Sequence, residues 1–107
     1  MVVQRFDVWM VQLNPTIGSE IKKSRPCVIV SPNVANNYLN TVTILPLTST
    51  FKNYPTRLDL TFQQKKGQIV IDQIRSIDKA RLIKKMGVID KRTSLRVLRV
   101  LEEYFSF

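Results

Sequence analysis

Histidine is absent from the sequence and cysteine occurs once, which removes several kinds of enzyme chemistry from consideration. Without histidine there is no imidazole to act as acid and base near neutral pH, and the usual zinc sites of cysteine and histidine cannot form. A disulfide within one chain needs two cysteines. The single one, Cys27, lies inside an apolar run, so we expect it to pack in the core of a protein from the reducing cytoplasm.

Long apolar runs and cofactor-binding motifs are missing as well. No stretch approaches the roughly 20 apolar residues that cross a bilayer, and the N-terminal residues lack the layout of a secretory signal. Neither a GxGxxG nor a Walker A sequence is present, so a nucleotide cofactor has no support. Asp72 and Asp78 are one carboxylate pair of the kind that binds a divalent ion, but such a pair is common by chance. We therefore expect no metal, no cofactor and no membrane association.

Acidic residues are scarce: eight Asp and Glu stand against 17 Lys and Arg, for a formal net charge of +9. Such a balance favours polyanionic partners, which include nucleic acid, an anionic membrane face and an acidic protein. Between positions 65 and 99 the cations greatly outnumber the acids, as on a binding face. The alternative is a solvated basic surface, and Lys65 and Lys66 fit that description on sequence alone.

What the sequence does contain is the patterning of short strands. Its 107 residues indicate one domain, residues 1–107, whose modest core favours dimerisation. Apolar alternation and turn residues predict strands over 5–13, 26–31, 41–49, 57–62, 68–78 and 85–89. The stretch 68–78 should bend near Asp72, where the apolar phase slips. We expect a long loop over 14–24, a turn at 65–67 and helical turns within 33–41 and 79–82.

The C-terminal segment has helical spacing instead. Leu95, Leu98, Leu101 and Phe105 recur after Thr93 and Ser94, which are plausible caps, and this apolar stripe predicts a core or dimer surface. The predicted fold is thus mainly β with one amphipathic C-terminal helix, arranged as a small, partly open SH3-like barrel.

Two buried runs end in side chains that suit a phosphate. Arg25 stands at the mouth of the run 26–30 with a planar fork of donors, and Thr48 and Ser49 follow the run 42–47. Donors aimed at a phosphodiester stabilise the charge that develops when the ribose 2′-OH attacks it. The plainer alternatives are an ion pair between Arg25 and Glu20 or Asp72, and ordinary strand-end hydrogen bonds for Thr48.

Three ordered blocks of the sequence resemble MazF/PemK toxins of type II toxin–antitoxin systems. They are Asp-Val-Trp through Ser-Arg-Pro-Cys-Val-Ile-Val-Ser-Pro at 7–32, Leu-Pro-Leu-Thr-Ser-Thr at 45–50, and Gly-Gln-Ile-Val-Ile-Asp-Gln-Ile-Arg at 67–75. The resemblance implies a CcdB/PemK-type barrel, a homodimer and metal-independent cleavage of single-stranded mRNA at a short sequence. The expected products carry 2′,3′-cyclic phosphate and 5′-OH ends, and the expected partner is a MazE-like antitoxin with an acidic disordered tail.

The resemblance also assigns roles to residues. It implies that Arg25 and Thr48 are catalytic and that Glu20 matters for activity and RNA contact. Expected RNA contacts are Ser19, Ser31, Ser49 and Gln73, to which we add the nearby basic residues Arg5 and Arg75. Because arginine is almost never deprotonated, Arg25 suits charge stabilisation or proton donation, and Glu20 is the candidate base.

The chain departs from the PemK/Kid branch of the family. That branch has a catalytic histidine in the first loop and an arginine before the Asp-Gln pair; the matching residues here are Ser19 and Val70, and only Asp72 is kept. We therefore favour the Arg25/Thr48 site and interpret Asp72 as structural. Trp9 could stack on a base, or lie in a core or dimer interface.

Two other functions fit the same fold class. A CcdB-like gyrase poison would bind a protein, leave RNA intact and not depend on Arg25 and Thr48. A non-catalytic RNA-binding module would bind with a steep salt dependence and leave no cyclic phosphate ends.

Overall fold

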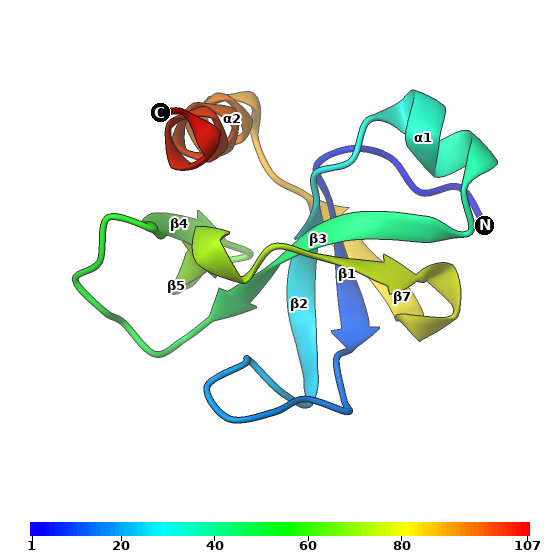
Figure 1. Cartoon of the computed structure of the whole chain (residues 1–107), viewed down its shortest axis with the longest axis horizontal. Helices are drawn as coiled ribbons and strands as arrows, with labels where there is room; N and C mark the ends of the chain where they lie inside the picture. The colour runs from blue at the N-terminus through cyan, green and yellow to red at the C-terminus, as the bar shows by residue number, and fades with distance from the viewer.

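Seven strands, two α-helices and two 3₁₀ turns make up the computed structural model, which describes residues 1–107 (Figure 1). In chain order they are β1 (Asp7–Gln12), β2 (Ser24–Ile29), α1 (Asn33–Tyr38), β3 (Thr41–Thr48), β4 (Arg57–Phe62), β5 (Lys65–Val70), η1 (Ile71–Gln73), β6 (Arg75–Asp78), η2 (Lys79–Arg81), β7 (Leu82–Val88) and α2 (Lys91–Phe105). The strands predicted from the sequence all occur, and the expected bend near Asp72 is η1. No helix combines the length and apolar character needed to span a membrane.

The strands form an antiparallel sheet in the order β4-β5-β3-β2-β1-β7, with β6 paired to β3 outside this path. Strand β3 is long and serves two sets of neighbours as it crosses the molecule (Figure 1). Its first part pairs with β2 and β6, and its last residues pair with β5. No ladder joins the end strands β4 and β7, so the predicted partly open barrel with a C-terminal helix is confirmed.

Side chains nevertheless join the two open ends of the sheet. The Gln63 side-chain Nε2 donates to the Met86 carbonyl at 2.6 Å, and the Phe62 ring lies against Gly87. The β4–β5 hairpin tip is thereby held against β7.

Two apolar clusters form the core on opposite sides of β1. Val8 belongs to the cluster under α2, and its neighbour Trp9 belongs to the other one, as alternation along a strand requires. Helix α2 buries Val97 fully. Leu95 and Phe105 of the predicted apolar stripe are exposed, so the core alternative is wrong for these two residues and the dimer surface stays a prediction.

Three local predictions are also wrong: the start of the first strand, the position of the hairpin turn and the cap of α2, which was expected at Thr93 or Ser94. The first strand begins at Asp7 and not at position 5, because Phe6 has a positive φ of 72°. The predicted turn at 65–67 is part of β5; the turn itself is Gln63-Gln64, with φ of 50° and 68°. Two-residue hairpin loops favour such angles, and these glutamines give no glycine signal. Helix α2 is capped by Asp90, whose carboxylate accepts from the Thr93 N–H at 2.7 Å.

Candidate active site

The site predicted around Arg25 and Thr48 lies where β2 and β3 separate. Their ladder ends at the pair Cys27↔Pro46, and proline has no N–H with which to continue it. Beyond this pair, Thr48 is bonded to β5 opposite Gln68, while Arg25 remains paired with β1. Each of the two residues lies two positions past the last β2–β3 pair, so they stand on either side of the opening.

A cavity of about 320 Å³ occupies this opening and is lined by both residues. Its polar lining includes Arg25, Thr48, Ser49, Lys65 and Lys66, without any carboxylate. Its apolar lining includes Met10, Leu60, Phe62 and Met86. Three cations around a partly apolar cavity favour an anion, because little opposing charge is present to neutralise them.

Arg25 is held in place with most of its donors free. It is half-buried, and its Nε donates to the Lys22 carbonyl at 3.2 Å. The terminal guanidinium nitrogens make no hydrogen bond within the protein. The only ion pair in the structure joins Lys85 to Asp7, so the alternative of an Arg25 ion pair with Glu20 or Asp72 is wrong. The free nitrogens can take two oxygens of one phosphate.

Thr48 is buried, and it makes one hydrogen bond of the ordinary strand-end kind that the plainer alternative expects. Its Oγ1 accepts from the Thr50 N–H at 3.1 Å, which orients the hydroxyl and leaves the O–H proton available as a donor. Gly67 of β5 lies directly against the Thr48 backbone, which lets the two strands approach here. The hydroxyl is thus fixed at the cavity wall.

Cys27, a residue of β2 at the last pair with β3, packs as expected. It is fully buried and its Sγ donates weakly to the Arg25 carbonyl at 3.5 Å. Burial raises the pKa of the thiol to about 12, although Arg75 and Arg25 act in the opposite direction. Cys27 is therefore a protonated packing residue at neutral pH and not a nucleophile.

Four more predicted residues share a second cavity of about 360 Å³ beside the loop 14–24: Ser19, Glu20, Gln73 and Arg75. The Gln73 amide accepts from the Ile21 N–H at 2.6 Å and donates to the Ser19 carbonyl at 3.2 Å, which ties the loop to η1. Glu20 accepts from the Ile17 N–H at 2.6 Å. Strand β3 links the two cavities, since Pro46 lines this one and Leu47 lines the first. Glu20 is therefore not in the cavity of Arg25 and Thr48.

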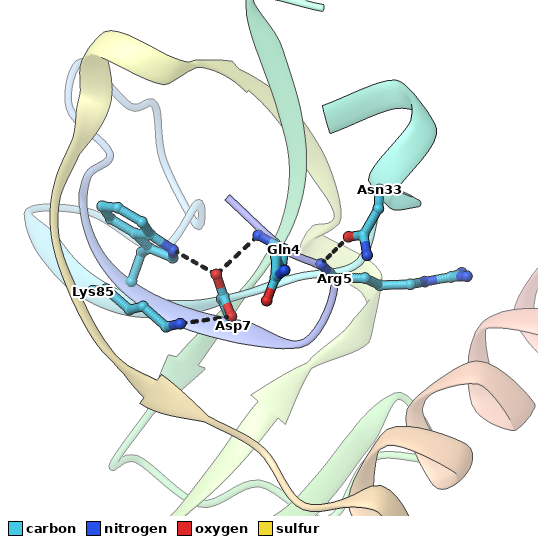
Figure 2. Close-up of polar contacts among 6 residues, drawn as sticks. Gln4, Arg5, Asp7, Asn33 and Lys85 are labelled. Atoms are coloured by element: carbon cyan, nitrogen blue, oxygen red, sulfur yellow. Dashed lines mark hydrogen bonds and ion pairs between the residues drawn. The ribbon is translucent and has the colours of Figure 1, made fainter. Parts of the chain in front are cut away.

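Arg5 and Ser31 lie apart from both, in a third cavity between α1 and α2. Figure 2 shows the Arg5 side chain extending away from Asp7, and the Arg5 N–H donating to Asn33 Oδ1 at 2.7 Å. Arg5 Nε also donates to the Val30 carbonyl at 2.9 Å. The Ser31 hydroxyl accepts from the Thr43 N–H at 3.0 Å and donates to Asn36. Both side chains hold the α1 region in place.

Trp9 is a core residue. It is buried, and its indole N–H donates to Asp7 Oδ2 at 3.2 Å. The same oxygen accepts from the Gln4 N–H at 2.9 Å. Base stacking by Trp9 is therefore wrong, and the core interpretation is confirmed.

Lys65 and Lys66 are exposed, as the interpretation of a solvated basic face expects, but the sequence does not predict that they also line the Arg25 cavity. They line the Arg25 cavity because β5 begins at Lys65 and runs beside the end of β3. If the turn had been predicted at Gln63-Gln64, both lysines would have been assigned to the start of β5, beside the end of β3.

The fold and this cavity define a small, open barrel-like protein able to hold an anion between two diverging strands. A family model described as PemK-like, MazF-like toxin of type II toxin–antitoxin system matches residues 4–105. The chain belongs to this family, as the sequence blocks predict.

Known relatives agree with the family and the fold. The chain is 28% identical over 108 residues to Endoribonuclease EndoA of Bacillus subtilis, covering 95% of this chain and 93% of that protein. It is 37% identical over 71 residues to Endoribonuclease toxin MazF of Escherichia coli, covering 66% of this chain and 64% of that protein. The crystal structure of MazF from Deinococcus radiodurans superposes with a TM-score of 0.89 at 22% identity, covering 100% of this chain and 99% of that one. An endoribonuclease in complex with its cognate antitoxin from a mycobacterial species superposes with a TM-score of 0.82 at 21% identity, covering 98% of each chain.

Proposed function

We propose that this protein is the toxin of a type II toxin–antitoxin system and cleaves single-stranded mRNA at a short sequence. The observation that carries the proposal is the cavity between β2 and β3, where Arg25 and Thr48 meet with two lysines and no carboxylate. The names of the curated relatives, which are endoribonucleases, support the same activity.

In the proposed reaction the ribose 2′-oxygen attacks the adjacent phosphorus while the bond to the 5′-oxygen breaks. RNA contains this nucleophile itself, so the protein needs to position the phosphate and stabilise its charge. The free nitrogens of Arg25 hold the non-bridging oxygens, and the Thr48 O–H donates to the same developing charge. The products are a 2′,3′-cyclic phosphate and a 5′-OH, and no metal takes part.

Two proton transfers complete the reaction. The departing 5′-oxygen needs a proton, which the Arg25 guanidinium can donate while solvent returns one to it. Glu20 is the proposed base for the 2′-OH. Because it lines the neighbouring cavity, this role requires the loop 14–24 to approach Arg25 when RNA binds.

The RNA strand is proposed to run across both cavities. Ser49 lies in the first with Arg25, and Ser19, Gln73 and Arg75 lie in the second. Lys65 and Lys66 add positive charge beside the cleaved phosphate. Arg5 and Ser31 are outside this path, so a contact with RNA there requires a longer strand.

The proposed setting is the cytoplasm, with the chain acting as one domain in a homodimer. The proposed inhibitor is a MazE-like antitoxin whose acidic tail competes with RNA for the same field. The net charge of +9 and the antitoxin present in a solved structure of similar fold support this partner.

The proposal is tested by incubating the purified protein with a long, weakly structured RNA in EDTA and mapping the ends. We expect discrete cuts with cyclic phosphate and 5′-OH termini, lost in Arg25→Ala and kept in the remote variant Lys91→Gln. Bound but uncut RNA would indicate a non-catalytic RNA-binding module. Unbound RNA together with inhibition of DNA gyrase would indicate a CcdB-like poison.

A further inference from the structure

A second basic cavity, larger than the first, lies between α2 and the loop that follows β3. It has a volume of about 700 Å³, within the range of natural ligand sites. Its cations are Lys52, Arg57, Arg96 and Arg99, from three different elements of the chain. Asp59 is the one carboxylate in the lining, so the cavity carries an excess of positive charge.

The floor of this cavity is rigid because one buried amide joins its parts. Gln68 Oε1 accepts from the Lys52 N–H at 3.0 Å and from Arg57 Nη1 at 3.1 Å. Gln68 Nε2 donates to the Lys52 carbonyl at 3.2 Å and to Asp59 Oδ1 at 2.8 Å. Asp59 thus has a protein donor, and the loop carrying Lys52 is fastened to β5.

Several donors on the residues that line this cavity have no acceptor in the protein. Arg57 Nε is buried without a hydrogen-bond partner, whereas Arg57 Nη1 already donates to the Thr50 carbonyl at 2.9 Å and to Gln68 Oε1. Arg96 and Arg99 are exposed on α2, and neither they nor Lys52 takes part in an ion pair. Four cations with free donors around one concave surface are suited to a phosphate group.

Aromatic rings accompany these cations. Phe51 and Tyr54 line the cavity and are 50% and 54% exposed. The Arg57 guanidinium lies over the Tyr54 ring at 5.7 Å from its centre, and the Arg57 N–H donates to the Tyr54 carbonyl at 3.1 Å. These two contacts hold Tyr54 in place, and part of its ring surface remains open to solvent. A base of single-stranded RNA can stack on such a ring, and this favours RNA over an acidic peptide as the occupant.

The cavity is also continuous with the Arg25 site. Thr48 and Gln68 are partners in the β3–β5 ladder; Thr48 lines the Arg25 cavity and Gln68 lines this one. The short connection from Ser49 to Phe51 leads from one cavity to the other along the chain. An RNA strand that leaves the cleaved phosphate on this side next meets the cavity between α2 and the loop that follows β3.

We propose that this cavity is a distal subsite for the same RNA. It binds a backbone phosphate among Lys52, Arg57, Arg96 and Arg99, and a base on Tyr54 and Phe51. The subsite rests on the proposed ribonuclease function and deepens it, because it makes the substrate longer than the cleavage sequence alone.

The test compares two RNAs: a short one limited to the mapped cleavage sequence, and an extended one with unstructured flanks. The variant Arg96→Gln/Arg99→Gln is compared with Lys91→Gln/Arg92→Gln, which removes equal charge from the first turn of the same helix. We expect the ratio of kcat/KM for extended over short RNA to fall about tenfold in the first variant and to stay at the wild-type value in the second. The salt slope for the extended RNA should also decrease by about 1 in the first variant alone.

Stacking is tested separately with Tyr54→Phe and Tyr54→Leu. We expect Phe to keep the preference for extended RNA and Leu to reduce it several-fold, roughly as loss of one stacked base requires. Equal ratios in all variants would overturn the subsite while leaving the nuclease intact.

The two proposals can fail separately. If the wild type cuts neither RNA, the nuclease proposal fails, and direct binding of the extended RNA still tests the cavity; equal affinities of the two double variants would overturn it. A poly-glutamate peptide is the second probe. If Arg96→Gln/Arg99→Gln lost affinity for this peptide and not for extended RNA, the cavity would belong to an acidic protein partner, and the RNA subsite would be wrong.

Discussion

Gly67 stands so close to Thr48 that a Cβ at position 67 would lie 3.0 Å from the Thr48 carbonyl oxygen. The contact is with backbone, which cannot rotate away as a side chain would. Gly67→Ala should therefore push β5 from β3 and cost about 1–3 kcal/mol in the free energy of unfolding, as overpacked sites do. Urea unfolding measures the loss, and cleavage by the folded fraction should fall too because Thr48 is displaced. Wild-type values for both would contradict this close packing.

Thr48 should act through its O–H and not through its shape. Thr48→Val keeps the volume and removes the donor, so we expect a loss of about 100-fold in kcat, in line with removal of one donor to a developing oxyanion. Thr48→Ser keeps the hydroxyl and should recover most of the rate. Single-turnover cleavage of a short RNA separates the variants, and equal rates for Val and wild type would remove Thr48 from the mechanism. The lost acceptor for the Thr50 N–H should also cost Val about 1 kcal/mol of stability.

Cys27 should be unreactive in the folded protein. With a pKa raised to about 12 from its ordinary 9.0, very little thiolate is present at neutral pH. Alkylation by iodoacetamide should be slow in buffer and fast in denaturant, and prolonged exposure should leave cleavage intact. The fold favours the neutral thiol. The contribution of Cys27 to the free energy of unfolding is therefore complete below pH 9.0 and is lost as the pH rises toward 12. Rapid labelling in buffer would contradict the buried position.

Asp90 should make the stability of α2 depend on acid pH. Hydrogen bonds from Thr93 hold the pKa of this carboxyl below its ordinary 3.8, helped by Arg92 and Arg96. A lowered pKa means that the contribution is present above 3.8 and is lost as the pH falls through the folded value. Asp90→Asn can cap the helix without titrating, so its unfolding free energy should vary less with pH in this range. Parallel curves for the two proteins would contradict the capping role.

The strands and the pair at the centre of the site were accessible to prediction because they depend on local patterns. Apolar runs ending in Arg25 and in Thr48 place both residues at strand ends, and antiparallel pairing brings such ends together. Proline at position 46 then stops the ladder where the cavity opens. These relationships follow from residue type and spacing.

What could not be predicted depends on contacts between distant segments. Gln73 stays a predicted RNA contact, but the sequence gives no sign that its amide also holds a loop more than 50 positions away, through the Ser19 carbonyl. Lys65 and Lys66 could not be placed because the hairpin turn uses glutamines at positive φ, which carry no turn signal of their own. Trp9 could not be assigned to the core, since only the fold shows that Asp7 is buried and accepts its indole N–H.

Only one cation of this protein is in an ion pair, Lys85 with the buried Asp7, so most of the positive charge has no carboxylate in direct contact. The cations repel one another across a small surface, and that repulsion opposes the compact state. Any polyanion that binds only the folded chain reduces this repulsion, and by mass action it raises the melting temperature of the protein. We therefore expect binding and folding to be linked: a complex of the folded chain with the proposed RNA or acidic inhibitor should unfold at a higher temperature than the free protein.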